Sequence, residues 1–462
     1  MIYKFKLYNR YFISHTLLIT IISCITFATR NTQLLLLNII SIMAILAVFD
    51  LCIFLFKKSI RREDYTFTFL LTAALVLAGL SIYTFFVINR VMLYESDHTV
   101  YYDLTIELWA LFKKSQIKGL AGIVLSCWHS DYSYLICVFL SSVYSFMPHT
   151  HEMFILSYYA LLIVPTYITF IIFAYSIAEK AKISPRKMAA IFGICMLLFP
   201  LPHFASLLGM PDIFGLFFCF STMIILINNR MERYDFFICL LISVLTIILI
   251  YIRRWYLFWI IGFLPVYFVL PHHIKGIKEN TICLSCEKGK NALGILVISG
   301  IMLSPFIYHN LINRHYSEEY SQWMIGGMTF ELYNQVGYLG ILFAAVLLIG
   351  FVYGLFTNEI RDLSLTSIIG FVISIFLFTR IQNMGKHQSL LLVPYYSVFL
   401  CNYIVFSLKK KKFVTFILVG CLVSILLLNG LSSILVWHDD LNGLFLFTKY
   451  AISSRFTWNL KF

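Results

Sequence analysis

The sequence predicts an all-α polytopic membrane protein with about thirteen membrane-spanning helices, and three observations carry this prediction. Only 12% of the 462 residues are charged and 60% are hydrophobic, whereas a soluble domain has about a quarter of its residues charged. The mean hydropathy is +0.86. Apolar runs of about 20 residues, the length at which a helix crosses the hydrocarbon core, recur from end to end. The sequence lacks the ten-residue alternating strands of a membrane barrel.

The apolar runs divide the chain into predicted spans. They lie at 11–28, 33–56, 66–88, 152–177, 188–203, 212–228, 236–252, 255–271, 292–309, 337–356, 363–379, 389–407 and 413–437. The apolar stretch 133–147 is short and follows a polar loop, so we expect an interfacial or re-entrant helix there. The chain reads as a single transmembrane domain over 1–462, with a first large outer loop at about 89–151 and a second at about 309–336.

Basic residues set the predicted orientation. They cluster in alternate short segments, at the N-terminus and at 57–62, 180–187 and 409–412. Because short cytoplasmic segments are rich in Lys and Arg, we expect the N-terminus in the cytoplasm and, with thirteen spans, the C-terminus outside. The net charge of +13 is therefore assigned to topology rather than to nucleic-acid binding.

The first outer loop gathers acidic residues. Glu95, Asp97 and Asp103 precede or begin a segment whose apolar residues recur at helical spacing through Phe112. This spacing predicts an amphipathic helix lying along the membrane surface. A carboxylate beside the membrane can act as a general base on a hydroxyl, so Asp97 or Glu95 is a catalytic candidate and Asp103 a substrate-binding one. The alternative is a solvated loop whose acids cap a helix.

The order of these features resembles the GT-C glycosyltransferases, which use sugars carried on polyprenyl phosphates. That group has an acidic pair at the start of its first large outer loop, matched here by Glu95 and Asp97. It has an Asp-Tyr-Pro-Pro-Leu-like stretch near the end of the loop, matched by Asp131-Tyr132-Ser-Tyr-Leu. Here both prolines are replaced, and the loop follows the third predicted span rather than the first. The resemblance implies a substrate-binding role for Asp131 and Tyr132.

Two later outer turns carry further candidates. The segment from His203 to Asp212 links two spans, and the resemblance implies that an acid there lines the substrate cavity. Arg253 and Arg254 form a tight turn on the side that the charge rule disfavours. Arginine binds phosphate in a bidentate manner, so we expect this pair to hold a lipid phosphate. The alternatives are a helix-dipole role for Asp212 and head-group anchoring for the arginines.

The turn between the eleventh and twelfth predicted spans is also polar and basic. Arg380 and His387 lie in it, and similar late turns of the resembled family contribute to donor phosphate binding. We therefore count both as substrate-binding candidates.

Together these residues suggest an enzyme that moves a sugar from a polyprenyl-phosphate donor to a glycan or glycolipid acceptor on the outer face. A divalent metal, Mg²⁺ or Mn²⁺, bridging Glu95 and Asp97 to the phosphate would fit this chemistry, and the sequence leaves metal dependence open. Richness in Ile, Phe and Tyr, without an N-x-Ser/Thr sequon, favours a bacterial plasma membrane. The acceptor would then be lipopolysaccharide O-antigen or another envelope polysaccharide.

Other functions remain open at this point. A lipid-linked glycan polymerase would also carry outer arginines, but in mid-chain loops. A transporter or flippase would place polar residues inside its spans. A membrane scaffold would need no site.

Overall fold

The computed structural model describes residues 32–88, 97–144, 149–207, 210–229, 234–269, 280–314, 316–324 and 326–435. All secondary structure in these ranges is helical. The α-helices are α2 (Leu35–Ser59), α3 (Tyr65–Ile88), α4 (Asp97–Lys114), α5 (Gln116–His129), α6 (Tyr134–Tyr144), α7 (His151–Tyr158), α8 (Val164–Ala181), α9 (Pro185–Leu198), α10 (Pro200–Leu207), α11 (Asp212–Asn229), α12 (Phe236–Ile252), α13 (Tyr256–Val269), α14 (Asn280–Phe306), α15 (Tyr316–Glu319), α16 (Met328–Leu339), α17 (Ile341–Phe356), α18 (Arg361–Phe378), α19 (Val393–Leu408) and α20 (Lys412–Leu435). Short 3-10 or π turns are η1 (Thr32–Leu34), η2 (Arg62–Asp64), η3 (Tyr159–Ile163), η4 (Ile307–Ile312), η5 (Ser321–Trp323) and η6 (Gln388–Leu392).

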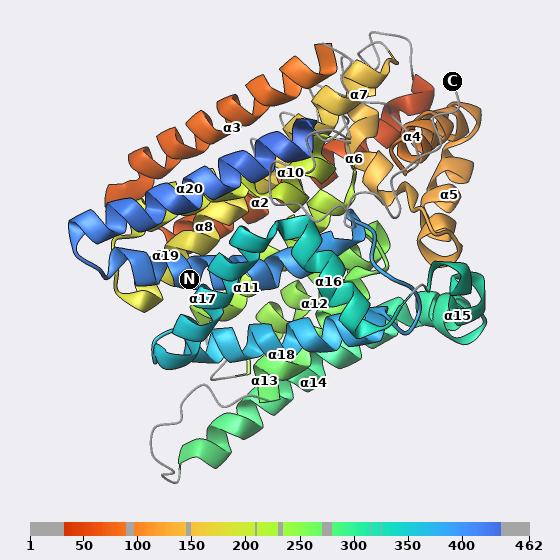
Figure 1. The fold of residues 1–462 in the computed structure, drawn as a ribbon. Coiled ribbons are helices and arrows are strands. Elements are labelled where there is room, and N and C mark those ends of the chain that lie inside the picture. Colours follow the sequence, from red (N-terminus) through yellow and green to blue (C-terminus); the bar gives the residue numbers. More distant parts are fainter. Residues whose placement is uncertain are drawn as a thin grey trace.

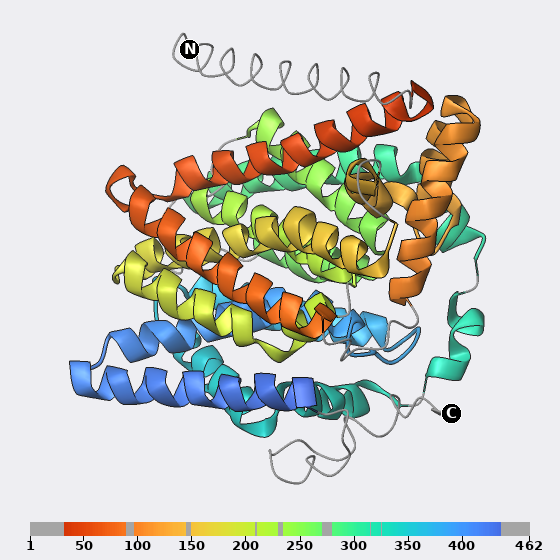
Figure 2. The same cartoon turned by 90° about the horizontal axis from the view of Figure 1, so that it is seen from above.

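Three spans form the buried centre of the molecule. Helices α8, α11 and α19 contact one another and are almost enclosed by the remaining helices (Figure 1). Around them, α13 packs on α18, α17 on α19, and α12 on α14. Figure 2 shows α2 and α20 at opposite edges of this bundle. The centre is mostly apolar, because most of the side chains that these three helices bury are hydrophobic.

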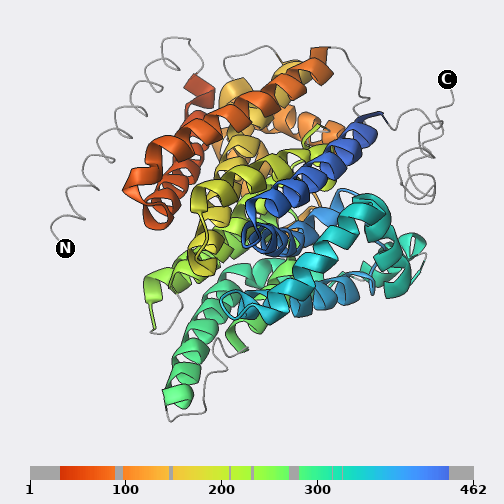
Figure 3. The same ribbon diagram turned by 60° about the vertical axis from the view of Figure 1, so that its left-hand side comes forward.

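The peripheral helices expose apolar side chains. Leu293, Leu296 and Ile301 on α14 and Phe413 and Phe416 on α20 are all exposed, and α14 projects beyond its neighbours (Figure 3). Clusters of exposed apolar side chains such as these would favour aggregation if the protein were soluble. In a bilayer they face lipid, so the protein is a multi-pass membrane protein.

Eight described helical segments are long and apolar enough to cross a membrane, and a ninth is added if a bent pair counts as one span. The eight coincide with predicted spans. Two shorter apolar helices, α12 and α13, match the predictions at 236–252 and 255–271. The first predicted span, 11–28, lies outside the described residues, so the count of thirteen stays a prediction.

Two predicted spans are interrupted. The run 188–203 breaks at Phe199, which is extended because Pro200 follows it. The run 337–356 begins as α16, and the chain then bends by 108° into α17. The bend is at Gly340, whose φ of +75° is disfavoured for residues with a Cβ.

The two helices of the first outer loop differ from the predicted surface arrangement in one respect. Leu108 and Phe112 on α4 are fully buried against protein rather than facing lipid. Helix α5 folds back along α4, and Gly119 allows this because a Cβ there would lie 2.3 Å from the Phe112 ring. Helix α6, the predicted interfacial piece, has 11 residues and is about 16 Å long, too short to cross a core of about 30 Å.

Segments predicted to lie on the same side of the membrane meet in the structure. Arg61 pairs with Glu179 at 2.7 Å, and Arg186 pairs with Asp64, joining two predicted cytoplasmic segments. At the other end, α5 of the first predicted outer loop contacts η4, which leads into the second predicted outer loop. The candidate site is built at this second end.

Candidate functional site

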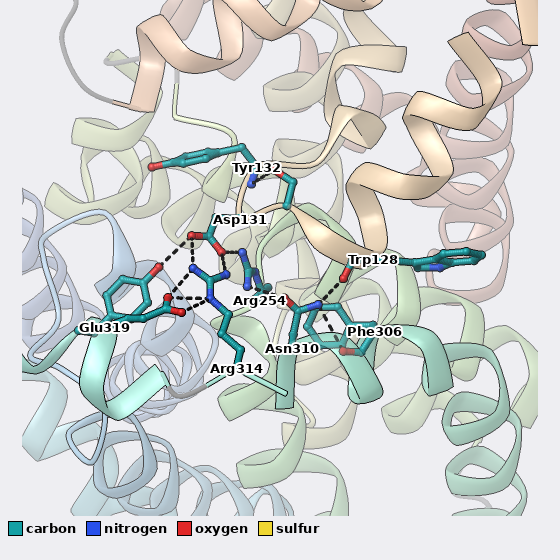
Figure 4. Close-up of polar contacts among 10 residues, drawn as sticks. Trp128, Asp131, Tyr132, Arg254, Phe306, Asn310, Arg314 and Glu319 are labelled. Carbon is teal, nitrogen blue, oxygen red and sulfur yellow. Dashed lines mark hydrogen bonds and ion pairs between the residues drawn. The ribbon is translucent and has the colours of Figure 1, made fainter. Parts of the chain in front are cut away.

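Asp131 is the centre of an ion-pair cluster between the two outer loops (Figure 4). Arg254 and Arg314 both pair with its Oδ1, and Nη2 of Arg314 donates to Oδ2 at 3.0 Å. The Tyr320 hydroxyl donates to Oδ2 at 3.1 Å. Arg314 also forms a fork with Glu319, with Nε–O distances of 2.6 and 2.8 Å. Two cations and two anions therefore share one small volume.

The chain holds Asp131 in place through serine side chains. The Tyr132 amide donates to Ser130 Oγ at 3.2 Å, and the Tyr134 amide to Ser126 Oγ at 3.0 Å. The Leu135 amide donates to Ser133 Oγ at 3.0 Å, so Ser133 caps α6. Ser133 and Tyr134 stand where the resembled motif has prolines. Their hydrogen bonds hold the turn that prolines would restrain by fixing φ.

Arg254 reaches the cluster from the turn between α12 and α13. Its Nη1 donates to Asn310 Oδ1 at 2.8 Å, and Asn310 in turn donates to the carbonyls of Trp128 and Phe306. The side chain is 13% exposed. Burial, together with the neighbouring Arg314 charge, lowers the pKa of Arg254 to about 10, and Glu319 and Asp131 raise the pKa of Arg314. Arg254 thus carries a costly charge that requires an anion close by.

Two cavities meet at Asp131. One is a groove with about 610 Å³ of empty space, and Asp131, Arg254 and Tyr320 lie at its polar end. The rest of its wall is mostly apolar, formed by Trp255, Leu257, Phe258, Phe306, Phe378 and Ile381. The other has about 760 Å³ of empty space and a polar wall that includes His129, Ser130, Tyr132, His309, Asn310 and Arg314. The rings of His129 and His309 lie 4.0 Å apart between centroids.

The arginine pair predicted to act together is divided. Arg253 lines neither cavity. Its Nε lies 3.1 Å from Asp212 Oδ1, and both side chains are only 1% exposed. The guanidinium also lies between 5.2 and 5.3 Å from the ring centroids of Tyr101, Tyr132 and Trp255, within range of cation–π attraction.

Asp212 is fixed by more than its ion pair. Trp255 Nε1 donates to its Oδ1 at 3.2 Å, and the Tyr256 hydroxyl donates to its carbonyl at 2.6 Å. Gly215, one turn along α11, leaves room for the Tyr256 ring, because a Cβ there would lie 2.1 Å from it. No donor among the described residues reaches Oδ2. This pair therefore ties α11 to the α12–α13 turn.

A second buried polar cluster holds the bend before α17. Glu331 is fully buried, and its carboxylate accepts from the Met384 amide at 2.9 Å, Asn383 Nδ2 at 3.2 Å and Gln335 Nε2 at 2.8 Å. Gln335 also donates to Ser389 Oγ at 2.7 Å. These bonds attach α16 to the segment between α18 and α19, whose Gln382 lines the apolar groove.

The remaining predicted residues lie outside the described part or line neither cavity. Glu95 lies outside the described residues. Asp97 begins α4 and His203 lies in α10, but their side chains are also outside the described part. Asp103 on α4 and Arg380 are exposed, and Arg380 lies 4.5 Å from the Phe376 ring centroid. His387 is half-buried. Asp131, Tyr132 and Arg254 are the predicted residues at the cavities.

Nothing in the local sequence pattern pointed specifically to Arg314, Glu319, Tyr320 and Asn310 as site residues. Their loop was recognised as an outer segment, but an arginine followed five residues later by a glutamate is a common pattern. Metal binding is not supported within the described ranges, where no group of three or more His, Cys, Asp or Glu side chains could hold an ion. The predicted Glu95–Asp97 metal pair stays a prediction.

No family model, curated protein or solved structure matches this chain.

Proposed function

We propose that this protein is a membrane glycosyltransferase that takes a sugar from a lipid-phosphate donor. The observation that carries the proposal is the position of Arg254 and Arg314 where an apolar groove meets a polar cavity. A polyprenyl-phosphate sugar has the same order of parts: an apolar chain, a phosphate and a polar sugar. Two guanidinium groups at this junction are suited to the phosphate.

The chemistry assigned to the residues follows from this placement. The lipid chain would lie against Trp255, Phe258 and Phe378, and the sugar would enter the polar cavity. An acceptor hydroxyl would attack the anomeric carbon and give its proton to Asp97 or Glu95. The carbon–oxygen bond to phosphate breaks, and the lipid phosphate leaves with the electron pair. Arg254 and Arg314 would stabilise its charge, and direct displacement inverts the anomeric centre.

One observation favours a second candidate. Arg254 and Arg314 come from mid-chain loops, as we expect for a lipid-linked glycan polymerase. The same phosphate site would serve that reaction. A polymerase extends a lipid-linked glycan by many units, whereas a transferase adds one sugar, so product length separates the two.

The test is transfer by the purified protein in lipid nanodiscs. Radiolabelled undecaprenyl-phosphate sugars are supplied with a panel of glycolipid acceptors, and product length is read on gels. We expect Arg254→Ala and Arg314→Ala each to lower kcat by about 10²–10³-fold. Arg62→Ala is the matched control, because this exposed arginine lies at the opposite end of the molecule, and it should retain full transfer.

A second pair of variants tests the base. Asp97→Asn and Glu95→Gln should separate the acid that takes the proton from a neighbour that only binds, with about 10²–10⁴-fold lower kcat for the base. Undiminished transfer in both single variants and in their double variant would remove this assignment. Absence of transfer by the wild-type protein across the whole donor and acceptor panel would reject the enzyme proposal.

A further inference from the structure

Asp131 stands in the place that the proposed function assigns to the donor phosphate. It contacts Arg254 and Arg314, the two cations that would bind that phosphate, and it lines both cavities. A phosphate arriving at this junction would meet two neutralised arginines and a like charge. Binding therefore requires the Asp131 carboxylate to move.

The protein needs an anion at this position when no ligand is bound. The Arg254 side chain is 13% exposed and Arg314 is 25% exposed. Two like charges held this close and partly shielded from water repel each other strongly unless an anion lies between them. Glu319 pairs with Arg314, and Arg254 contacts the Asp131 carboxylate and the neutral Asn310 amide.

The same carboxylate anchors a nearby segment. We define the outer strap as residues 316–324, which include α15 and η5. Arg314 lies just before it, Glu319 and Tyr320 lie within it, and all three belong to the Asp131 cluster. At its other end the Asn383 amide donates to the Trp323 carbonyl at 3.2 Å. Tyr320 also borders the apolar groove, so the strap covers one side of the junction.

We infer that Asp131 is a displaceable internal counter-anion that occupies the phosphate position, and that arrival of a lipid phosphate releases the outer strap. The inference rests on the proposed function and names how its ligand gains the site. On displacement, Arg254 and Arg314 exchange a carboxylate for a phosphate, so their charges stay compensated. The Tyr320 hydroxyl then loses its bond to Asp131, and the strap loses this link to the first outer loop. The displaced side chain has space in the polar cavity, which is open to solvent and which Asp131 already lines.

The test measures binding without transfer. Protein in phosphate-free detergent is titrated with n-dodecyl phosphate by isothermal calorimetry, with inorganic phosphate in a parallel arm. We expect Asp131→Asn to bind n-dodecyl phosphate about tenfold more tightly than wild type, because the competing state is removed. Asparagine keeps an acceptor for Tyr320 and Arg314, which limits the loss of stability from removing the charge. Glu319→Gln is the matched control. It removes the other carboxylate on Arg314 but lines neither cavity, and it should change affinity much less.

The two ligand arms distinguish sources of phosphate. A lipid phosphate uses the groove, so n-dodecyl phosphate should bind more tightly than inorganic phosphate to both proteins. Equal or weaker binding of n-dodecyl phosphate by Asp131→Asn than by wild type would overturn the inference. Equal gains in affinity for n-dodecyl phosphate in Asp131→Asn and Glu319→Gln would also overturn it, since the gain would then come from removing any negative charge near the arginines.

A wild-type measurement keeps the inference testable if Asp131→Asn does not fold. Hydrogen exchange of the outer strap should rise when n-dodecyl phosphate saturates the wild-type protein. Unchanged or slower exchange of residues 316–324 would overturn the release of the strap. Tighter binding by Asp131→Asn together with no sugar transfer by wild type would support the inference and reject the proposed function. Sugar transfer by wild type together with unchanged n-dodecyl phosphate binding by Asp131→Asn would support the proposed function and reject the inference.

Discussion

Removing one partner of the buried Asp212–Arg253 pair should destabilise the protein far more than removing both. Both side chains are 1% exposed, so neither charge can be compensated by water. Arg253→Met leaves Asp212 with one described side-chain donor, Trp255 Nε1, on Oδ1. An uncompensated buried charge costs about 3–5 kcal/mol, and we expect Arg253→Met and Asp212→Asn each to lower the free energy of unfolding by about that amount.

The double variant is the decisive comparison. With both charges gone, the neutral amide keeps its bond from Trp255, and methionine fills the space among three aromatic rings. We expect the double variant to be within about 1–2 kcal/mol of wild type, since replacing a whole buried pair by uncharged groups is often neutral.

The assay is unfolding in mixed detergent micelles at increasing dodecyl sulfate, followed by tryptophan fluorescence and analysed as a double-mutant cycle. Arg380→Met is the control, because among the described residues the side chain of this exposed arginine makes a single cation–π contact, with Phe376, and its loss should change stability by about 0.5 kcal/mol. Single variants that cost under about 1 kcal/mol, or a double variant whose cost equals the sum of the singles, would refute the reasoning.

Three further predictions concern single positions. Gly340→Ala should lower the free energy of unfolding by about 1–3 kcal/mol, because φ is +75° there. The control is Gly420→Ala in α20, where a Cβ would meet nothing within 4 Å, and it should be neutral or slightly stabilising. Unfolding in micelles measures both variants, and equal effects would contradict the strain argument. Burial lowers the pKa of Lys386 to about 8, whereas an unfolded lysine has a pKa of about 10.4. Between these two pH values the unfolded chain binds this proton and the folded chain does not, so the free energy of unfolding should rise with pH relative to Lys386→Met. Parallel pH profiles of the two proteins would exclude the effect. Ser133→Ala should lower the free energy of unfolding by about 1 kcal/mol, because it removes the cap of α6. Ser133→Thr should be close to wild type, and a threonine variant as unstable as the alanine variant would argue against capping.

The sequence predicted those features that depend on local composition. Apolar runs located the long helices. The predicted spans 188–203 and 337–356 ran through Pro200 and Gly340, where the structure breaks them, although both residues are turn or breaker residues readable in the sequence. The 108° angle between α16 and α17 was not predictable. Helix α16 is held through Glu331, which bonds to Asn383 and Met384, about 50 residues away in the chain.

The site was predictable in part. Asp131 and Arg254 were identified as polar residues at predicted outer turns, and the structure brings them into contact. The different positions of Arg253 and Arg254 were not predictable from the sequence. Adjacent residues in an extended turn point in different directions, and only the surrounding aromatic rings decide which of the two is buried. Arg314 was not singled out because its partners are set by loop packing, which has no periodic signal.

The distance along the chain between the cluster partners has a consequence for biogenesis. Arg314 follows Asp131 by 183 residues, so at about 5–20 residues per second of synthesis it emerges from the ribosome roughly 10–40 s later. During that interval the first outer loop is complete while its Arg314 counter-ion is not yet made. The junction of the two cavities is therefore among the last parts of the protein to assemble, and a chain truncated before the second outer loop would insert most of its helices without it.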